Sequence, residues 1–139
     1  MFTIAPYRNE HFDGVESLWR VCFANDPERN HAAIAIPTKL AHADGLFWVA
    51  LDEKNTVIGT TMAGWDGHRG WLYAVAVDTS WRRSGVGKAL VEHAITSLKK
   101  RGCEKVNLQI RAGNEEVKAF YQGLGFSVEP RTSMGRVIL

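Results

Sequence analysis

The chain has 139 residues, of which 45% are hydrophobic and 23% are charged, and its formal net charge is +2. This composition is typical of an ordinary folded domain, and it excludes a disordered chain and a strongly polyanion-seeking one. It gives no support to nucleic-acid binding. The first residues hold no apolar signal segment, and the most apolar run, residues 45–51, is far shorter than the ~20 residues of a membrane-spanning helix. We therefore expect a cytoplasmic protein that binds neither membranes nor nucleic acid.

Cysteine and histidine positions indicate no metal site. Cys22 and Cys103 are too far apart in the sequence to form a local metal-binding knuckle. The five histidines are dispersed and lack the spacing of metal ligands. We expect two reduced thiols, buried among the many apolar residues.

Apolar periodicity predicts a strand, a helix and three further strands in the first half of the chain. The residues after the helix, 25–45, are interrupted by Pro27 and Pro37 and are expected to form a loop, a helix and a second loop. The linker 52–55 is short and rich in turn-forming residues, so the strands on either side of it form an antiparallel hairpin. In chain order, the expected elements are a strand at 2–7, a helix at 12–23 and strands at 46–51, 56–65 and 71–77.

The second half of the chain alternates helices with strands, which predicts a parallel crossover and therefore a mixed, mostly antiparallel sheet. The first helical stripe ends in cations followed by Gly102, and the second has Asn114 as its N-cap and Gly125 just after its end. The expected elements are helices at 86–98 and 115–124 and strands at 105–111, 126–130 and 133–139. We expect a single α/β (α+β) domain over residues 1–139, with about seven strands and about four helices. The last residues, 137–139, could also pair across a sheet edge in a homodimer.

The segment RRSGVGK, which begins at Arg82, joins a predicted strand to a predicted helix. It is not a Walker loop, because Arg82 and Ala89 stand where that motif needs its first glycine and its metal-binding hydroxyl. It nevertheless suits an anion, since the first N–H groups of a helix lack partners and Gly85 and Gly87 leave the backbone open. The positive charges around it are those of Arg82, Arg83 and Lys88. The alternative is that the glycines only make a tight turn.

Two sequence strings share the spacing of a known pair of signatures. The first, VAVDTSWRRSGVGKAL, fits Q/R-x-x-G-x-G/A at Arg82, Gly85 and Gly87. The second, NEEVKAFYQGLGF, fits N-x-x-x-x-x-x-Y-x-x-x-G-F at Asn114, Tyr121, Gly125 and Phe126. With both strings in this order among its strands and helices, the chain resembles the GNAT superfamily, whose members transfer acetyl from acetyl-CoA to an amine.

The resemblance implies where coenzyme A binds. Its pyrophosphate would lie on the glycine turn, at Arg82, Arg83, Ser84, Gly85, Val86, Gly87 and Lys88. Its pantetheine arm would pair like an added strand with Val75, Ala76 and Val77. Asn114 would contact the same arm, although a plain N-cap is an open alternative and the two roles are compatible. The implied reaction is direct transfer to a primary amine, of a small molecule or a protein, in a ternary complex.

The resemblance also implies that Tyr121 contacts coenzyme A and protonates the leaving thiolate. With a thiol pKa near ~8.5 and a phenol pKa near ~10, this proton transfer is only about 1.5 units uphill. The alternative is that Tyr121 is one more member of an apolar helix face with Phe120 and Leu124.

Strict alternation in the strand 71–77 predicts two different faces. One face would carry Trp71, Tyr73, Val75 and Val77. The other would carry Ala74 and Ala76, whose small size either admits a cofactor or a helix or simply fits the core.

The sequence offers only a weak candidate for the general base. The strand 71–77 has no carboxylate, and Gln109, which cannot take a proton at neutral pH, stands where relatives acting on protein N-termini often have glutamate. The loop 66–70 offers the imidazole of His68 as a proton acceptor, with Asp66 to orient it, although such residues also make ordinary solvated turns. A non-catalytic module that binds acyl-CoA as a sensor or regulator is therefore the alternative function.

Overall fold

One mixed sheet of five strands runs through residues 1–108 of the computed structural model, which describes residues 1–139. The strands lie in sequence order, and neighbours are antiparallel except for β4 and β5, which are parallel. The strands are β1 (Phe2–Pro6), β2 (Phe47–Asp52), β3 (Val57–Trp65), β4 (Gly70–Val77) and β5 (Val106–Asn107). The predicted hairpin, parallel crossover and mixed sheet are therefore confirmed.

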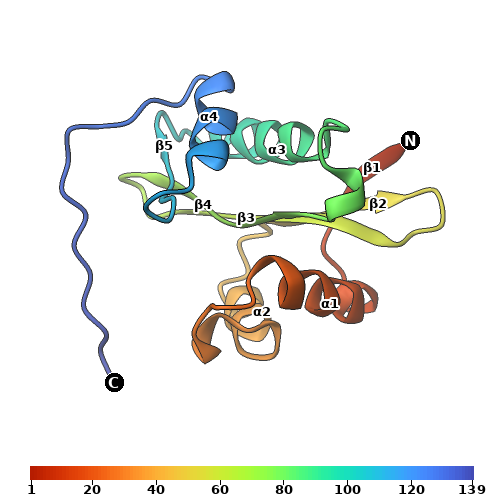
Figure 1. Cartoon of the computed structure of the whole chain (residues 1–139). Coiled ribbons are helices and arrows are strands. Elements are labelled where there is room, and N and C mark those ends of the chain that lie inside the picture. Colours follow the sequence, from red (N-terminus) through yellow and green to blue (C-terminus); the bar gives the residue numbers. More distant parts are fainter. The chain divides into compact units, whose positions relative to one another are not determined.

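Three helices cover the two faces of this sheet (Figure 1). Helix α3 (Val86–Lys100) packs on one face against β3 and β4, and α1 (Phe12–Cys22) packs on the other, where it contacts α2 (Ala32–Ala41). Gly102 follows α3 with a φ of 97°, which confirms the predicted helix end. Short 3-10 turns lie at η1 (Asn9–His11), η2 (Glu28–Asn30) and η3 (Thr79–Trp81). No helix of the chain combines the length and the apolar character needed to cross a membrane.

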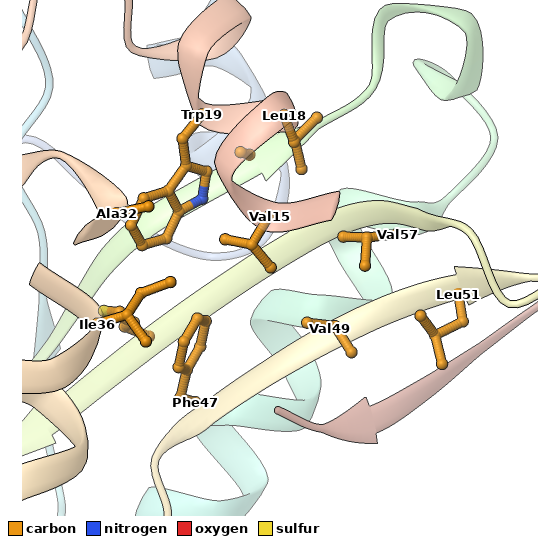
Figure 2. Packing of buried hydrophobic residues seen from close by; sticks show 11 residues of the cluster. Val15, Leu18, Trp19, Ala32, Ile36, Phe47, Val49, Leu51 and Val57 are labelled. Carbon is orange, nitrogen blue, oxygen red and sulfur yellow. The ribbon is translucent and has the colours of Figure 1, made fainter. Parts of the chain in front are cut away.

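The core beneath α1 is built from the predicted helical stripe. Val15, Leu18 and Trp19 lie at three- and four-residue spacing and are buried. Figure 2 shows Val15 and Trp19 reaching from α1 towards the strands. Their partners are Ala32 and Ile36 of α2 and Phe47, Val49, Leu51, Val57, Met62 and Ala76 of the sheet. On the opposite face, α3 buries Val86, Leu90, Val91, Ala94 and Leu98.

Gly59 of β3 brings α3 close to the sheet. A methyl group at this position would lie 2.9 Å from Leu90 Cδ1 and 3.0 Å from Val86 Cγ1, which is closer than van der Waals contact. The start of α3 therefore packs closely against β3 at this residue.

Residues 109–139 form a second unit, built around α4 (Glu115–Gly123). The Asn114 side chain accepts a hydrogen bond at 3.3 Å from the backbone N–H three residues on, which confirms its role as N-cap. Gly125 follows the helix with a φ of 94°, as predicted. The expectation of one domain over the whole chain stays a prediction.

The fold class is confirmed, but the sheet has five strands rather than about seven. Residues 126–130 and 133–139, which were expected to be strands, pair with no strand, and Met134 among them is 91% exposed. The strand expected at 105–111 is reduced to Val106–Asn107. Alternation shows which residues would share a face, but a strand also needs a partner backbone along its length.

Candidate functional site

The segment between β4 and α3 folds as a tight turn that opens the helix. The hydroxyl and the backbone N–H of Ser80 donate hydrogen bonds to Asp78 Oδ1 at 2.6 and 2.8 Å, and these bonds lower the pKa of Asp78. Arg83 and Gly85 follow with positive φ angles of 64° and 85°, and Gly85 is the N-cap of α3. These left-handed residues turn the chain sharply from the strand into the helix.

The N-terminus of α3 combines N–H groups that have no partner in the helix with positively charged side chains. The N–H groups of residues 86–88 lie in the first turn and have no acceptor within the helix. A methyl group at Gly85 would meet no atom within 4 Å, so the space in front of the helix is open. Three exposed side chains around it take part in no ion pair, namely Arg82, Arg83 and Lys88. This arrangement attracts an anion.

The outer edge of β4 carries no partner strand over most of its length. β5 pairs with β4 only at Gly70 and Trp71. The partners there are Val106 and Asn107. From residue 72 to 77, β4 is paired on its β3 side alone. An extended segment of this kind presents backbone N–H and C=O groups and is a template for strand addition.

A bulge interrupts the pairing of β3 with β4 in the same region. Met62 pairs with Tyr73. The next pair is Thr60 with Ala76. From one pair to the other the chain moves two residues along β3 but three residues along β4, so β4 holds one extra residue here. Ala74 lies in the bulge and has a φ of 48°.

The bulge makes the predicted faces of β4 wrong. Trp71 pairs with Gly64. Val77 pairs with Gly59, five residues away on β3, and residues five apart on a strand lie on opposite faces. Trp71 and Val77 therefore do not share a face, because the extra residue reverses every position after it. Ala76 is 4% exposed and belongs to the core beneath α1, so core packing explains its small size.

Asp66 organises the backbone of the hairpin turn that carries His68. Its Oδ1 accepts hydrogen bonds from the N–H groups of Arg69 and His68 at 3.0 and 2.8 Å, and these hold the pKa of Asp66 below its usual range. All three residues are exposed. The carboxylate serves the turn, which favours the interpretation as a solvated hairpin, and His68 as a base stays a prediction.

Tyr121 lies on α4 in the second unit and is 7% exposed. Its ring makes edge contacts with those of Phe120 and Phe126, with centroids 4.9 and 5.5 Å away. Burial raises the pKa of Tyr121 to about 12, so the phenol is a weaker acid than an unperturbed tyrosine. In the same unit, Gln109 Nε2 donates a hydrogen bond to Ser133 Oγ.

Both cysteines are free thiols, Cys103 buried and Cys22 half-buried. No group of three or more His, Cys, Asp or Glu side chains is placed to hold a metal ion.

Sequence reasoning missed one polar contact that reaches the bulge. The hydroxyl of Thr60 donates a hydrogen bond to the carbonyl oxygen of Ala74 at 2.8 Å. The available signal was a pair of threonines, Thr60 and Thr61, in an otherwise apolar strand, and both are fully buried.

The fold and this site define a mixed α/β protein in which an anion-attracting helix start lies beside an open strand edge. The model of the acetyltransferase (GNAT) family matches residues 12–126. Acetyltransferase SG1711 of Sodalis glossinidius (strain morsitans) is 35% identical over 130 residues, which cover 91% of this chain and 87% of that protein. The chain therefore belongs to the GNAT family of acetyltransferases.

Solved structures share the fold. AAC(6')-Iy, in complex with the bisubstrate analogue CoA-S-monomethyl-acetylneamine, matches with a TM-score of 0.81 and 21% identity, over 100% of this chain and 99% of that one. The NatC complex bound to Gag peptide and CoA matches with a TM-score of 0.75 and 24% identity, over 88% of this chain and 82% of that one. At these identities the likeness shows the fold alone.

Proposed function

We propose that this protein transfers the acetyl group of acetyl-CoA directly to a primary amine in a ternary complex. The observation that carries the proposal is the open edge of β4 beside the N-terminus of α3. The pantetheine arm has amide groups that suit a strand edge, and the pyrophosphate suits unpaired helix N–H groups flanked by cations. The proposed contacts are Val75, Ala76 and Val77 for the arm and Arg82, Arg83, Ser84, Gly85, Val86, Gly87 and Lys88 for the pyrophosphate.

The transfer needs an oxyanion donor, an acid and a base. The amine nitrogen attacks the thioester carbonyl carbon, and backbone N–H groups of residues 75–77 stabilise the negative charge on the carbonyl oxygen. The C–S bond then breaks, the thiolate takes a proton from Tyr121, and the amine gives up its proton to a base. Tyr121 is assigned on its sequence motif, and so is Asn114 as a further contact of the arm.

The raised pKa of Tyr121 sets a condition on its role. From a pKa of about 12, proton transfer to a thiolate whose thiol has a pKa near ~8.5 is uphill by about 3.5 units, or about 5 kcal/mol. The phenol therefore has to gain acidity in the complex, which a hydrogen bond to the developing thiolate would supply. The same pKa keeps the phenol protonated at neutral pH, so its proton is available.

The chemistry of the base favours an acceptor amine of low pKa. A lysine-like amine at pH 7 is neutral about once in a few thousand molecules, which costs about 4.6 kcal/mol, whereas about a tenth of α-amino groups are neutral. β4 carries no carboxylate, so His68 is the proposed base. AAC(6')-Iy was solved with an acetylneamine analogue and the NatC complex with a peptide, so the fold accommodates both small and peptide ligands.

Calorimetric titration with acetyl-CoA, followed by thiol release over a panel of amines, tests the proposed function. The panel holds a polyamine, an aminoglycoside, free amino acids and peptides with a free N-terminus or a lysine. We expect binding, and thiol release with at least one class. Binding without release for any amine would support the non-catalytic acyl-CoA module, which the absence of a β4 carboxylate and the presence of Gln109 favour. No binding would refute both.

A pair of matched double variants tests the pyrophosphate site. Arg83→Ala with Lys88→Ala removes two charges at the start of α3, and Lys99→Ala with Lys100→Ala removes two charges at its end. Because charge-assisted contacts to phosphate are lost only in the first, we expect its dissociation constant for CoA to rise at least about tenfold, and that of the second to change less than about twofold. Equal losses would place the pyrophosphate elsewhere.

A further inference from the structure

A chain of hydrogen bonds leads from α1 to the bulge of β4. The indole N–H of Trp19 donates to Thr60 Oγ1 at 2.9 Å, and the Thr60 hydroxyl donates to the Ala74 carbonyl oxygen at 2.8 Å. The direction is fixed, because an indole nitrogen only donates and a hydroxyl has a single proton. Trp19 is 5% exposed and Thr60 is 0% exposed, so the bond between them is buried, and the bond from Thr60 to Ala74 is partly buried.

The acceptor at the end of this chain has an unusual backbone conformation. Ala74 has a φ of 48°, in the left-handed region, which a residue with a side chain keeps only where its surroundings hold it. The Thr60 hydroxyl supplies such a hold from the neighbouring strand, because it fixes the direction of the Ala74 carbonyl.

Because the peptide group is rigid, fixing the direction of the Ala74 carbonyl also fixes the direction of the N–H of Val75. The chain has no cis peptide bond, so the peptide joining Ala74 to Val75 is planar and trans, and its C=O and N–H point in opposite directions. The C=O is directed at Thr60 on β3. The N–H of Val75 therefore points away from the Thr60 hydroxyl. At this residue β4 has no partner strand on the side that faces away from β3.

The same chain strengthens the donor. A carbonyl that accepts a hydrogen bond draws electron density from its own amide, so the N–H of the same peptide becomes a better donor. Successive bonds in a buried chain reinforce one another by roughly 10–30% each. Trp19 polarises the Thr60 hydroxyl, and that hydroxyl polarises the peptide that carries the Val75 N–H.

We propose that Thr60 and Trp19 are positioning residues that aim and polarise the N–H of Val75 towards the carbonyl oxygen of the acetyl thioester. The inference rests on the proposed function, because it needs an acyl donor on the open edge of β4. It narrows the oxyanion donor from a three-residue segment to one amide. It also gives α1 a part in catalysis, through a side chain that touches no substrate.

Thr60→Val is the main test, because it keeps the size of the side chain and removes the hydroxyl. Losing an oxyanion donor outright costs about 100- to 1,000-fold in kcat, and since this variant only loosens and weakens the donor, we expect a loss of about tenfold. The dissociation constant for CoA, which has no acetyl carbonyl, should stay within about twofold of the native value. Thr60→Ser keeps the hydroxyl and should restore kcat.

Thr61→Val is the matched control. Thr61 is also 0% exposed, and its hydroxyl donates only to the carbonyl of the next residue, Met62, at 3.4 Å. It should keep native kcat for the fastest amine of the panel. Trp19→Phe removes the first donor and leaves the Thr60 bond, so a smaller loss of about threefold is expected, in line with the modest reinforcement between linked bonds.

Infrared spectroscopy of bound acetyl-CoA labelled with ¹³C at the carbonyl measures the hydrogen bond to the carbonyl oxygen directly and needs no acceptor amine. The native protein should shift the carbonyl stretch to lower wavenumber than in free acetyl-CoA, and Thr60→Val should reduce that shift while Thr61→Val should not. If Thr60→Val fails to fold, Thr60→Ala removes the same hydroxyl and takes its place, with Thr61→Ala as its control.

Two results would overturn the inference. One is a kcat for Thr60→Val within twofold of that of Thr61→Val; the other is an unchanged carbonyl stretch. In both cases native binding and turnover would leave the proposed function standing. A native protein that neither binds acetyl-CoA nor releases thiol would instead refute the proposed function, and the inference with it.

Discussion

Replacing Gly59 with alanine is expected to lower the free energy of unfolding by about 2 kcal/mol, within the range of about 1–3 kcal/mol typical of overpacking. The added methyl group would lie 2.9 Å from Leu90 Cδ1, 3.0 Å from Val86 Cγ1 and 3.1 Å from the Ala76 carbonyl oxygen. The end of the Leu90 side chain can rotate away, whereas the Val86 side chain is β-branched and buried and has little freedom to turn. The carbonyl oxygen belongs to β4, so it moves only if the pairing of β3 with β4 is disturbed, and that is the main part of the cost.

Gly64→Ala in the same strand is the matched control, because its methyl group would lie 3.5 Å from Tyr73 Cε2, an ordinary van der Waals distance. Urea denaturation should show a lower midpoint with an unchanged slope for Gly59→Ala. The melting temperature should fall by about 6–8 °C. Gly64→Ala should stay within about 0.5 kcal/mol of the native chain. Equal stabilities for the two variants would refute the close approach of α3 to β3.

The same substitution reaches the proposed donor site. Val86 is the first residue of α3, so a methyl group that pushes it outward also moves the N–H groups of the first turn. We therefore expect Gly59→Ala to bind CoA more weakly than Gly64→Ala does, by calorimetry under conditions where both variants are folded.

Three further predictions follow from local geometry and charge. Gly85→Ala meets no clash but puts a side chain at a φ of 85°, so it should cost about 1 kcal/mol in denaturation and weaken CoA binding in calorimetry. Tyr121→Phe should lower kcat, and because burial raises the pKa of Tyr121 to about 12, the native pH–rate profile should show no alkaline fall from this group below pH ~10. Burial alone would raise the pKa of Asp44, but the hydrogen bond from Lys39 and further favourable contacts lower it. Its stabilisation is therefore present above its unfolded pKa near ~3.9 and is lost as the pH falls through the lower folded value. Asp44→Asn should thus destabilise the chain by about 1 kcal/mol at pH 7. In thermal denaturation at acid pH, the melting temperature of this variant should depend less on pH than that of the native chain.

Most of the fold followed from local chemistry in the sequence. The stripe of Val15, Leu18 and Trp19 defined the buried face of α1, and Asn114 and Gly125 marked the two ends of α4. These features depend on residues that are close together in the chain, so they can be predicted from one sequence.

The features that the sequence did not reveal depend on partner strands. Nothing in the alternation of β4 signals the extra residue at Ala74, because a bulge is defined only against the register of β3. The segments 126–130 and 133–139 alternate well enough for strands, yet pair with none. A pattern shows what a strand could bury, and tertiary structure decides whether it has a neighbour.

The candidate site divides in the same way. The glycine turn was readable because its chemistry lies within seven adjacent residues. The contact between Trp19 and Thr60 joins positions 41 residues apart, so spacing gave no hint of it. The raised pKa of Tyr121 comes from burial, which a sequence motif does not report.

The short length of β5 also affects where the sheet opens locally. A strand held at two positions detaches at a small free-energy cost, whereas β3 has neighbours on both sides. In deuterium exchange, amides at this border should therefore exchange through local opening, long before those of β3 do.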